Sequence, residues 1–169
     1  PSEGVSEAVV RPYRSPMRRL LPVAFILALA CGVHAGDAFT GRVVSVADGD
    51  TLTVLDQDEH QHIIRLAEID APEKAQPWGN RSKQHLADVC FQKQAEVRPQ
   101  TTDRYGRTVA RVICNGIDSS AEMVRSGMAW AFTKYLTDPQ IKAAELEARA
   151  EQRGLWADRE PLPPWEWRR

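Results

Sequence analysis

The sequence predicts an α+β domain in which a five-stranded OB-fold β-barrel is combined with three helices. Strand patterns come first, helical patterns lie between and after them, and the strands are short with tight polar connections. The length of 169 residues allows one domain, and 43% hydrophobic with 27% charged residues is ordinary for a soluble globular protein. This composition excludes a disordered chain, a collagen-like repeat and a multi-span membrane protein.

Residues 1–35 are predicted to be an upstream extension and a signal peptide. Two arginines follow Met17, and an apolar run of 11 residues comes next, at 20–30. A membrane-spanning helix needs about 20 apolar residues, whereas a short apolar run behind positive charge is typical of a secretory signal. We expect cleavage after Ala35, with lipidation at Cys31 as the competing route and a buried core helix as the alternative. The protein is then exported, periplasmic or extracellular, with no stable membrane span.

Five segments are predicted to be the strands of the barrel. Their alternating or β-rich patterns and the turn residues between them place strands at 41–46, 51–55, 62–69, 95–100 and 108–114. Pro72 ends the first three, which form a meander, because proline cannot donate a hydrogen bond to a strand ladder.

Three segments are predicted to be helices. The first spans 81–92, the second is begun at Ser119 by a capping box and ends at Gly127, and the third is capped by Asp138 and stops at Gly154. The domain is thus expected at 36–160. Residues 161–169 form a Pro- and Trp-rich tail, expected on the surface or against the body of the domain.

Two cysteines, Cys90 and Cys114, lie in the expected domain. Export makes the pair a disulfide candidate, because disulfides persist in oxidising compartments. Closing a loop of about 25 residues would contribute roughly 3 kcal/mol in the chain-entropy model. Two buried free thiols are the alternative.

The 22 basic and 23 acidic side chains leave a formal net charge of −1. A domain that binds a phosphate backbone tightly is strongly basic on at least one face. We therefore expect any nucleic-acid partner to be held locally, at one site, and transiently.

Three charged clusters fall at predicted loops: 48–51, Arg65 with 70–73, and 104–107. Each alone reads as an ordinary turn or an outward-facing charge. The histidines at 60, 62 and 85 show no metal-ligand spacing and are expected on the surface. Taken together, the acidic clusters suit a hard divalent cation, which prefers carboxylate and carbonyl oxygens.

The ligands of that cation would be the carboxylates of Asp50 and Asp70 and the carbonyl of Ala71. Glu73 is close enough in sequence to meet a water held by the metal. Arg65 and Arg107 can each grip phosphate oxygens with two N–H groups. A metal, a carboxylate and paired arginines are the components for in-line attack of water on a phosphodiester.

Three motifs in this order and spacing, at 46–51, 65–73 and 103–107, resemble those of one known family. From about Gly41 to Trp156 the chain is similar to staphylococcal-nuclease-like domains, the thermonuclease family of secreted calcium-dependent nucleases. Weaker matches occur at 123–129 and 154–156. The cysteine pair and the Pro- and Trp-rich tail resemble the family's exported bacterial members.

This resemblance implies a five-stranded OB barrel with three helices and a role for nine residues. The implied Ca²⁺ ligands are Asp50, Asp70 and Ala71. The implied catalytic residues are Arg65, Glu73 and Arg107, and the implied substrate-binding residues are Arg104, Tyr105 and Tyr135. In this chain Thr133 replaces a second substrate-side tyrosine of the family, and Arg104 replaces a lysine. Both departures concern substrate affinity and base preference.

We therefore expect a calcium-dependent nuclease that hydrolyses phosphodiester bonds of DNA and RNA with low sequence selectivity, as a monomer. A non-catalytic OB-fold module that binds nucleic acid or peptide is the alternative, although such a module has no need of the acidic and arginine positions. A purely structural exported protein leaves the same set of residues unexplained.

Overall fold

The computed structural model describes residues 36–169, so the predicted signal peptide, its cleavage after Ala35 and the lipidation alternative at Cys31 lie outside the described residues. Five strands form the barrel: β1 (Phe39–Val46), β2 (Thr51–Asp56), β3 (Gln61–Leu66), β5 (Gln94–Thr102) and β6 (Thr108–Cys114). Neighbours pair in the order β3-β2-β1-β5-β6, and a parallel pairing of β3 with β6 closes the barrel. The predicted α+β fold with a five-stranded OB barrel is confirmed.

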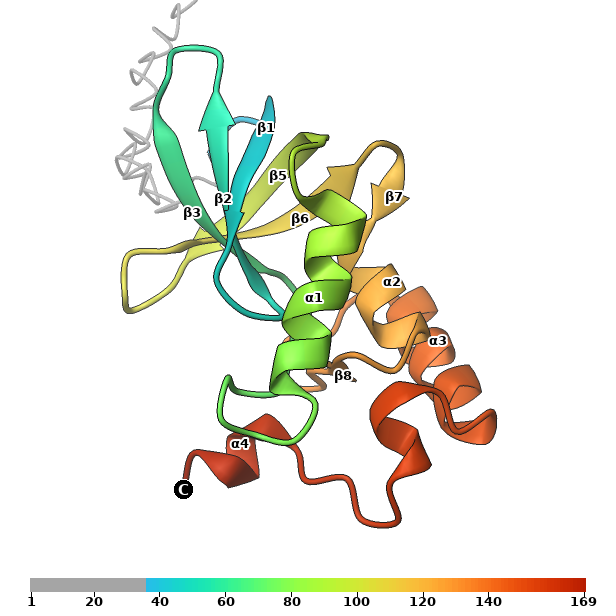
Figure 1. Ribbon diagram of the computed structural model, residues 1–169. Coiled ribbons are helices and arrows are strands. Elements are labelled where there is room, and N and C mark those ends of the chain that lie inside the picture. The colour runs from blue at the N-terminus through green and yellow to red at the C-terminus, as the bar shows by residue number, and fades with distance from the viewer. Residues whose placement is uncertain (1–35) are drawn as a thin grey trace, which may run out of the picture. The chain divides into compact units, whose positions relative to one another are not determined.

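The helices lie to one side and below the barrel in the view of Figure 1. They are α1 (Gly79–Cys90), α2 (Ser119–Arg125), α3 (Pro139–Ala150), the 3₁₀ helix η1 (Gly154–Ala157) and a short α4 (Pro164–Trp167). The two-residue strands are β4 (Ile69–Asp70), which pairs with β8 (Trp130–Ala131), and β7 (Ile117–Asp118), which pairs antiparallel with β6. Among residues 36–169, no helix is both long enough and apolar enough to cross a membrane.

The third predicted strand is split in two. β3 ends at Leu66, and Glu68 then takes a left-handed backbone conformation with a φ of 67°, which a residue within a strand does not adopt. Ala67 is not paired with β2, and its N–H donates a hydrogen bond to the carbonyl of Ala110 on β6. The chain therefore turns out of the barrel before β4, and this turn brings Asp70 back beside the end of β3.

The predicted ends of two helices were wrong. Asp118, not Ser119, caps α2 by accepting a hydrogen bond from the Ala121 N–H, while the buried Ser119 hydroxyl donates to a carbonyl of β6. α3 ends at Ala150, and Gly154 instead begins η1 with a positive φ of 56°. The N-cap of α3 at Asp138, followed by proline, is confirmed.

The alternating strand residues that the pattern assigned to one face form the core of the barrel. Fully buried members include Val43, Leu52, Val54, Ile64 and Leu66, joined by Leu86 from α1 and Met123 from α2.

The predicted disulfide between Cys90 and Cys114 is confirmed, and it joins the end of α1 to the end of β6. The covalent link and the shared core fix α1 against the barrel, and the loop before α1 carries Glu73.

Candidate active site

A polar groove of about 1000 Å³ opens where the end of β3, the turn before β2 and the β5–β6 hairpin meet. All nine residues predicted from the sequence line it: Asp50, Arg65, Asp70, Ala71, Glu73, Arg104, Tyr105, Arg107 and Tyr135. They come from five separate places along the chain, so the fold brings together residues that are far apart in the sequence. The groove is also lined by Phe132 and by Arg168 from the C-terminal tail.

The turn before β2 places Asp50 at the floor of this groove. A Cβ atom at Gly49 would lie 1.8 Å from the Ser82 hydroxyl and 2.8 Å from the Ala71 methyl, so only glycine fits between α1 and β4. The Asp50 carboxylate then accepts hydrogen bonds from the Thr51 hydroxyl at 2.9 Å and from the Ala71 N–H at 3.2 Å. Its geometry is therefore fixed from two sides.

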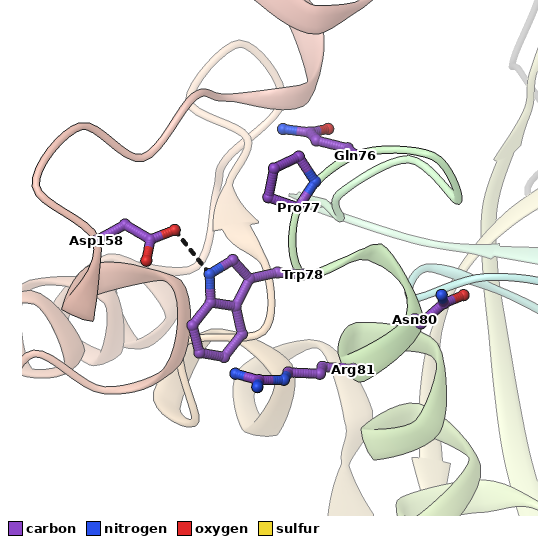
Figure 2. A pocket seen from close by; sticks show the side chains of 6 residues that line it. All are labelled: Gln76, Pro77, Trp78, Asn80, Arg81 and Asp158. Atoms are coloured by element: carbon purple, nitrogen blue, oxygen red, sulfur yellow. Dashed lines mark hydrogen bonds between the residues drawn. The ribbon is translucent and has the colours of Figure 1, made fainter.

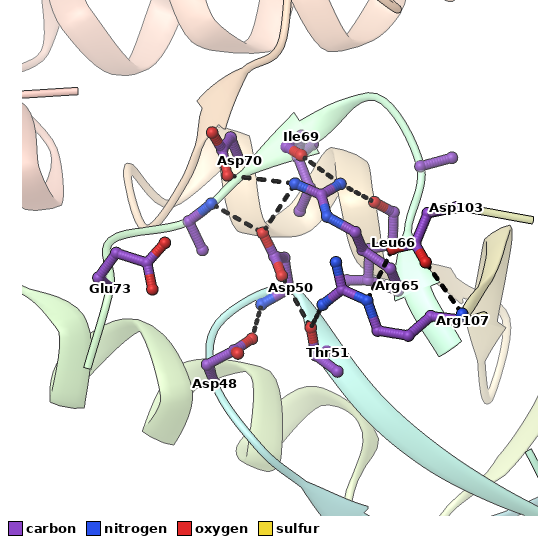
Figure 3. Close-up of polar contacts among 12 residues, drawn as sticks. Asp48, Asp50, Thr51, Arg65, Leu66, Ile69, Asp70, Glu73, Asp103 and Arg107 are labelled. Atoms are coloured by element: carbon purple, nitrogen blue, oxygen red, sulfur yellow. Dashed lines mark hydrogen bonds and ion pairs between the residues drawn. The ribbon is translucent and has the colours of Figure 1, made fainter. Parts of the chain in front are cut away.

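Arg65 joins the two predicted metal ligands (Figure 3). Its Nη2 lies 3.3 Å from Asp50 Oδ2 and 3.1 Å from Asp70 Oδ1, and its Nη1 donates to the carbonyls of Leu66 and Ile69. Both aspartates are buried, with 7% and 1% of their surface exposed. Two buried carboxylates that share one guanidinium must converge on the same small region.

Burial and mutual repulsion alter the protonation of the acidic floor. Burial, and after it the negative charge of Asp50, together raise the pKa of Asp48 to about 6. Burial also raises the pKa of Asp70, against the opposing effect of Arg168 and Arg65. Two carboxyl groups held above their ordinary pKa mark a place where additional positive charge would be favourable.

Those features fit a hard cation, because the donor set is made of buried, converging carboxylate oxygens.

A second acidic group lies elsewhere, on the exposed turn between β2 and β3, where ligand atoms of Asp56, Asp58 and His60 lie within 4.8 Å of one another. Sequence reasoning found no metal-ligand spacing at His60 and missed this group. Its Asp56 carboxylate already accepts hydrogen bonds from the Asp58 and His60 N–H groups, so the group also serves to shape the turn.

Arg107 is oriented by its own turn. Its Nε donates to Asp103 Oδ2 at 2.7 Å, and the other oxygen of Asp103 accepts from the Arg107 N–H. Gly106 makes this turn possible with a φ of 79°. Burial opposes ionisation of Asp103, but these hydrogen bonds from Arg107 prevail and lower its pKa, so the pair remains charged. Sequence reasoning missed Asp103 as the residue that orients Arg107.

Aromatic side chains form the outer part of the groove. Tyr105 is 68% exposed, and its ring lies beneath the guanidinium groups of Arg104 and Arg107 at 4.8 and 5.6 Å. Tyr135 is 58% exposed and packs edge-on against Phe132. The segment with Tyr135 is tied down by Glu68, whose buried carboxylate accepts from the Thr137 N–H and hydroxyl.

Glu73 is bound by a residue that the sequence did not point to. Arg168 Nη1 donates to Glu73 Oε1 at 2.6 Å, and Arg168 Nη2 donates to Asp70 Oδ2 at the same distance. The hydrogen bond to Asp70 is the main reason that the pKa of Arg168 lies above its ordinary value, and the hydrogen bond to Glu73 adds to the effect. The only hint in the sequence was the composition of the tail, which gives no position for a single arginine.

With this geometry established, comparisons with known proteins place the chain. The model of the family described as staphylococcal nuclease homologues matches residues 63–158. A micrococcal nuclease of Shigella flexneri is 40% identical over 167 residues, covering 92% of this chain and 95% of the relative. An uncharacterized endonuclease of Haemophilus influenzae is 46% identical over 130 residues, covering 77% and 73%.

The chain belongs to the staphylococcal nuclease family. The resemblance seen in the three sequence motifs is therefore confirmed, and so is the prediction of an enzyme of the nuclease class, a hydrolase. The dependence on calcium, the use of both DNA and RNA, and the roles of the nine residues stay predictions.

Proposed function

We propose that this nuclease is an exported, monomeric, calcium-dependent enzyme that hydrolyses phosphodiester bonds of DNA and RNA with low sequence selectivity. The observation that carries the proposal is the arrangement of Arg65 between two buried aspartates, in the same groove as Glu73 and Arg107. A binding module would have no use for buried carboxylates in the path of a polyanion, because they repel phosphate. A cation that neutralises them turns the same position into a phosphate site.

Asp50 and Asp70 would hold Ca²⁺ through their carboxylates, with the Ala71 carbonyl as a further oxygen ligand. Asp50 is prepared for this by the Thr51 hydroxyl and the Ala71 N–H, which fix its orientation. When bound, the cation would neutralise phosphate charge and favour ionisation of a nearby water.

Glu73 would act as the general base that orients or deprotonates the attacking water. Its side chain is 40% exposed and its carboxylate is directed toward Asp50 in Figure 3. Arg65 and Arg107 would stabilise the negative charge that grows on the phosphate oxygens as the bond forms. Arg107 would also assist the leaving oxygen.

Low selectivity follows from the type of side chain in the outer groove. Exposed rings such as Tyr105 and Tyr135 can stack on any base, since every base has a π-face. Arg104 contributes positive charge for a neighbouring phosphate, which is the same in every nucleotide. Location outside the cytoplasm is supported by the disulfide, which persists in oxidising compartments.

The proposal is tested with end-labelled single-stranded DNA and RNA of one sequence, incubated with calcium, magnesium or a chelator. We expect both to be cut in calcium, poorly in magnesium because it demands stricter octahedral geometry and keeps its waters, and not at all in chelator. Full activity in chelator contradicts the metal assignment. Tight binding without cutting under every condition supports the non-catalytic module instead.

A pair of matched variants locates the metal. Asp50→Asn should abolish calcium-dependent cutting, whereas Asp58→Asn makes the same change in the exposed acidic group of the β2–β3 turn and should leave the rate unchanged. If Asp58→Asn abolished cutting and Asp50→Asn did not, the functional cation would belong to the turn and not to the groove.

A further inference from the structure

The loop that carries Glu73 is irregular; Glu73 and Gln76 exchange hydrogen bonds within it, and the C-terminal tail contacts it from outside. It runs from the end of β4 to the start of α1 without regular secondary structure of its own. Within residues 36–169, the carboxylate of Glu73 receives hydrogen bonds from Arg168 alone. A glutamate with 40% of its side chain exposed would otherwise sample several rotamers.

Arg168 holds two carboxylates that would repel each other. One nitrogen of the guanidinium donates to Glu73 Oε1 and the other to Asp70 Oδ2, each at 2.6 Å, with a longer contact of 3.3 Å to Asp70 Oδ1. A planar guanidinium with fixed N–H directions sets the relative position of both groups, which a flexible ammonium cannot do. Glu73 Oε2 receives no hydrogen bond from residues 36–169, so one oxygen stays available to accept a proton.

The tail itself is anchored at two points that precede Arg168 in the chain. Trp165 stacks on Phe132 with ring centroids 5.7 Å apart and an interplanar angle of 11°, and it meets Trp130 edge-on. Gln76, in the Glu73 loop, donates through Nε2 to the Leu162 carbonyl at 2.6 Å. Figure 1 shows the tail passing below the start of α1, beside this loop.

A second pocket shows where the segment just before the tail meets the same loop (Figure 2). There Trp78 Nε1 donates to Asp158 Oδ2 at 2.8 Å, and the Arg81 guanidinium lies 4.6 Å from the centre of the Trp78 ring. The loop is therefore held by Asp158, just before the tail, and by Leu162 and Arg168 within the tail.

We propose that the C-terminal tail completes the active site and that Arg168 is a positioning residue, which holds the Glu73 carboxylate beside Asp70. The role assigned to Glu73 rests on the proposed function. Arg168 acts through Glu73 and Asp70, so its loss should lower turnover and leave substrate affinity nearly unchanged. Loss of a side chain that orients a metal ligand typically costs about 10–100-fold, and we expect kcat to fall by that amount.

The test compares Arg168→Ala with Arg168→Lys and with Arg169→Ala. The last variant removes the same charge one residue further along, from an exposed side chain that has no ion pair within residues 36–169. In saturating calcium, we expect Arg168→Ala to lose kcat with little change in KM, Arg168→Lys to recover part of it, and Arg169→Ala to match the wild type. Trp165→Leu, which removes the stack on Phe132, should lower kcat in the same way.

Amide hydrogen exchange provides a readout that needs no activity. We expect faster exchange at 73–78 in Arg168→Ala and Trp165→Leu, with the barrel strands unchanged. Unchanged kcat in Arg168→Ala overturns the proposal, even if exchange rises, because the tail is then only a structural support. A faster enzyme that binds calcium more tightly also overturns it, because Arg168 would then be a blocking cation.

The two proposals fail in different ways. If the wild-type protein cuts neither DNA nor RNA in any metal, the proposed function fails, and unchanged exchange at 73–78 in Arg168→Ala would separately refute positioning by the tail. If the wild type cuts in calcium and Arg168→Ala cuts equally well, the proposed function stands and the role of Arg168 is refuted.

Discussion

Replacement of Arg107 by lysine separates the chemistry of a guanidinium from its charge. In the structure the Arg107 Nε is committed to Asp103 at 2.7 Å, and Nη1 has only a long contact of 3.4 Å with the Thr51 hydroxyl. Nη2 has no hydrogen-bond partner within residues 36–169. Asp103 therefore holds one edge of the group, and the other edge is left for phosphate oxygens (Figure 3).

Lysine keeps the charge but cannot hold Asp103 and a phosphate at the same time with fixed geometry. Losing one preorganised donor to a developing oxyanion costs about 10²–10³-fold in kcat, or roughly 2.7–4 kcal/mol. Arg107 is 28% exposed, and its ion pair with Asp103 is near the surface, so the free energy of unfolding should change by less than about 1 kcal/mol. The expected result is a folded protein with a much slower reaction.

The assay is turnover of a short labelled oligonucleotide in saturating calcium, with circular dichroism and thermal unfolding to check the fold. Arg98→Lys is the matched control, because Arg98 pairs with Glu96 on the exposed face of β5 and does not line the groove. A wild-type rate in Arg107→Lys, or an equal loss in Arg98→Lys, would refute the reasoning.

Two further predictions concern stability. The folded pKa of Asp48, about 6, lies above its ordinary value of 3.8, so its ionisation lowers stability as the pH rises from about 4 to 6. In chelator, Asp48→Asn should therefore stabilise the protein by at most about 3 kcal/mol at pH 8 and have no effect near pH 3.5. Denaturant titrations measure both effects, and equal effects at the two pH values would contradict this prediction. Reduction of the Cys90–Cys114 bond should lower the free energy of unfolding by roughly 3 kcal/mol through the loop it closes, and two thiols alkylated in unfolded, non-reduced protein would show that the bond does not form.

Much of the fold was predictable because its signals are local. Alternation along β2 and β6 follows directly from one buried face per strand. The N-cap of α3 was predictable because an aspartate before proline has few other conformations available. The cap of α2 was misassigned because Asp118 and Ser119 are both good caps, and only burial of Ser119 against β6 decides between them.

The candidate site was predictable where its residues lie in short motifs and not where they depend on tertiary contacts. Asp50, Arg65, Asp70 and Arg107 occur in recognisable clusters, so their chemistry could be read before their positions were known. Arg168 belongs to no motif. It reaches Asp70, 98 residues earlier in the chain, because the stacking of Trp165 on Phe132 directs the tail back to the groove.

The raised pKa values were beyond sequence reasoning for the same reason. The turn with Asp48 looks ordinary in the sequence, and only in the folded chain do Ser82 and Ala71 come close to the neighbouring Gly49, where Asp48 is partly buried. Burial of this kind depends on the packing of α1 and β4 against the turn, which no local pattern encodes.

The most direct measurement is the rate at which Glu73→Gln cleaves a labelled oligonucleotide in saturating calcium, relative to the wild type. Glutamine keeps the size of the side chain and can still accept a hydrogen bond from Arg168, but it cannot take a proton from water. General-base catalysis is worth about 10²–10⁴-fold, so we expect a loss in that range with unchanged oligonucleotide binding. A wild-type rate in Glu73→Gln would show that the groove does not hydrolyse phosphodiesters in the way proposed.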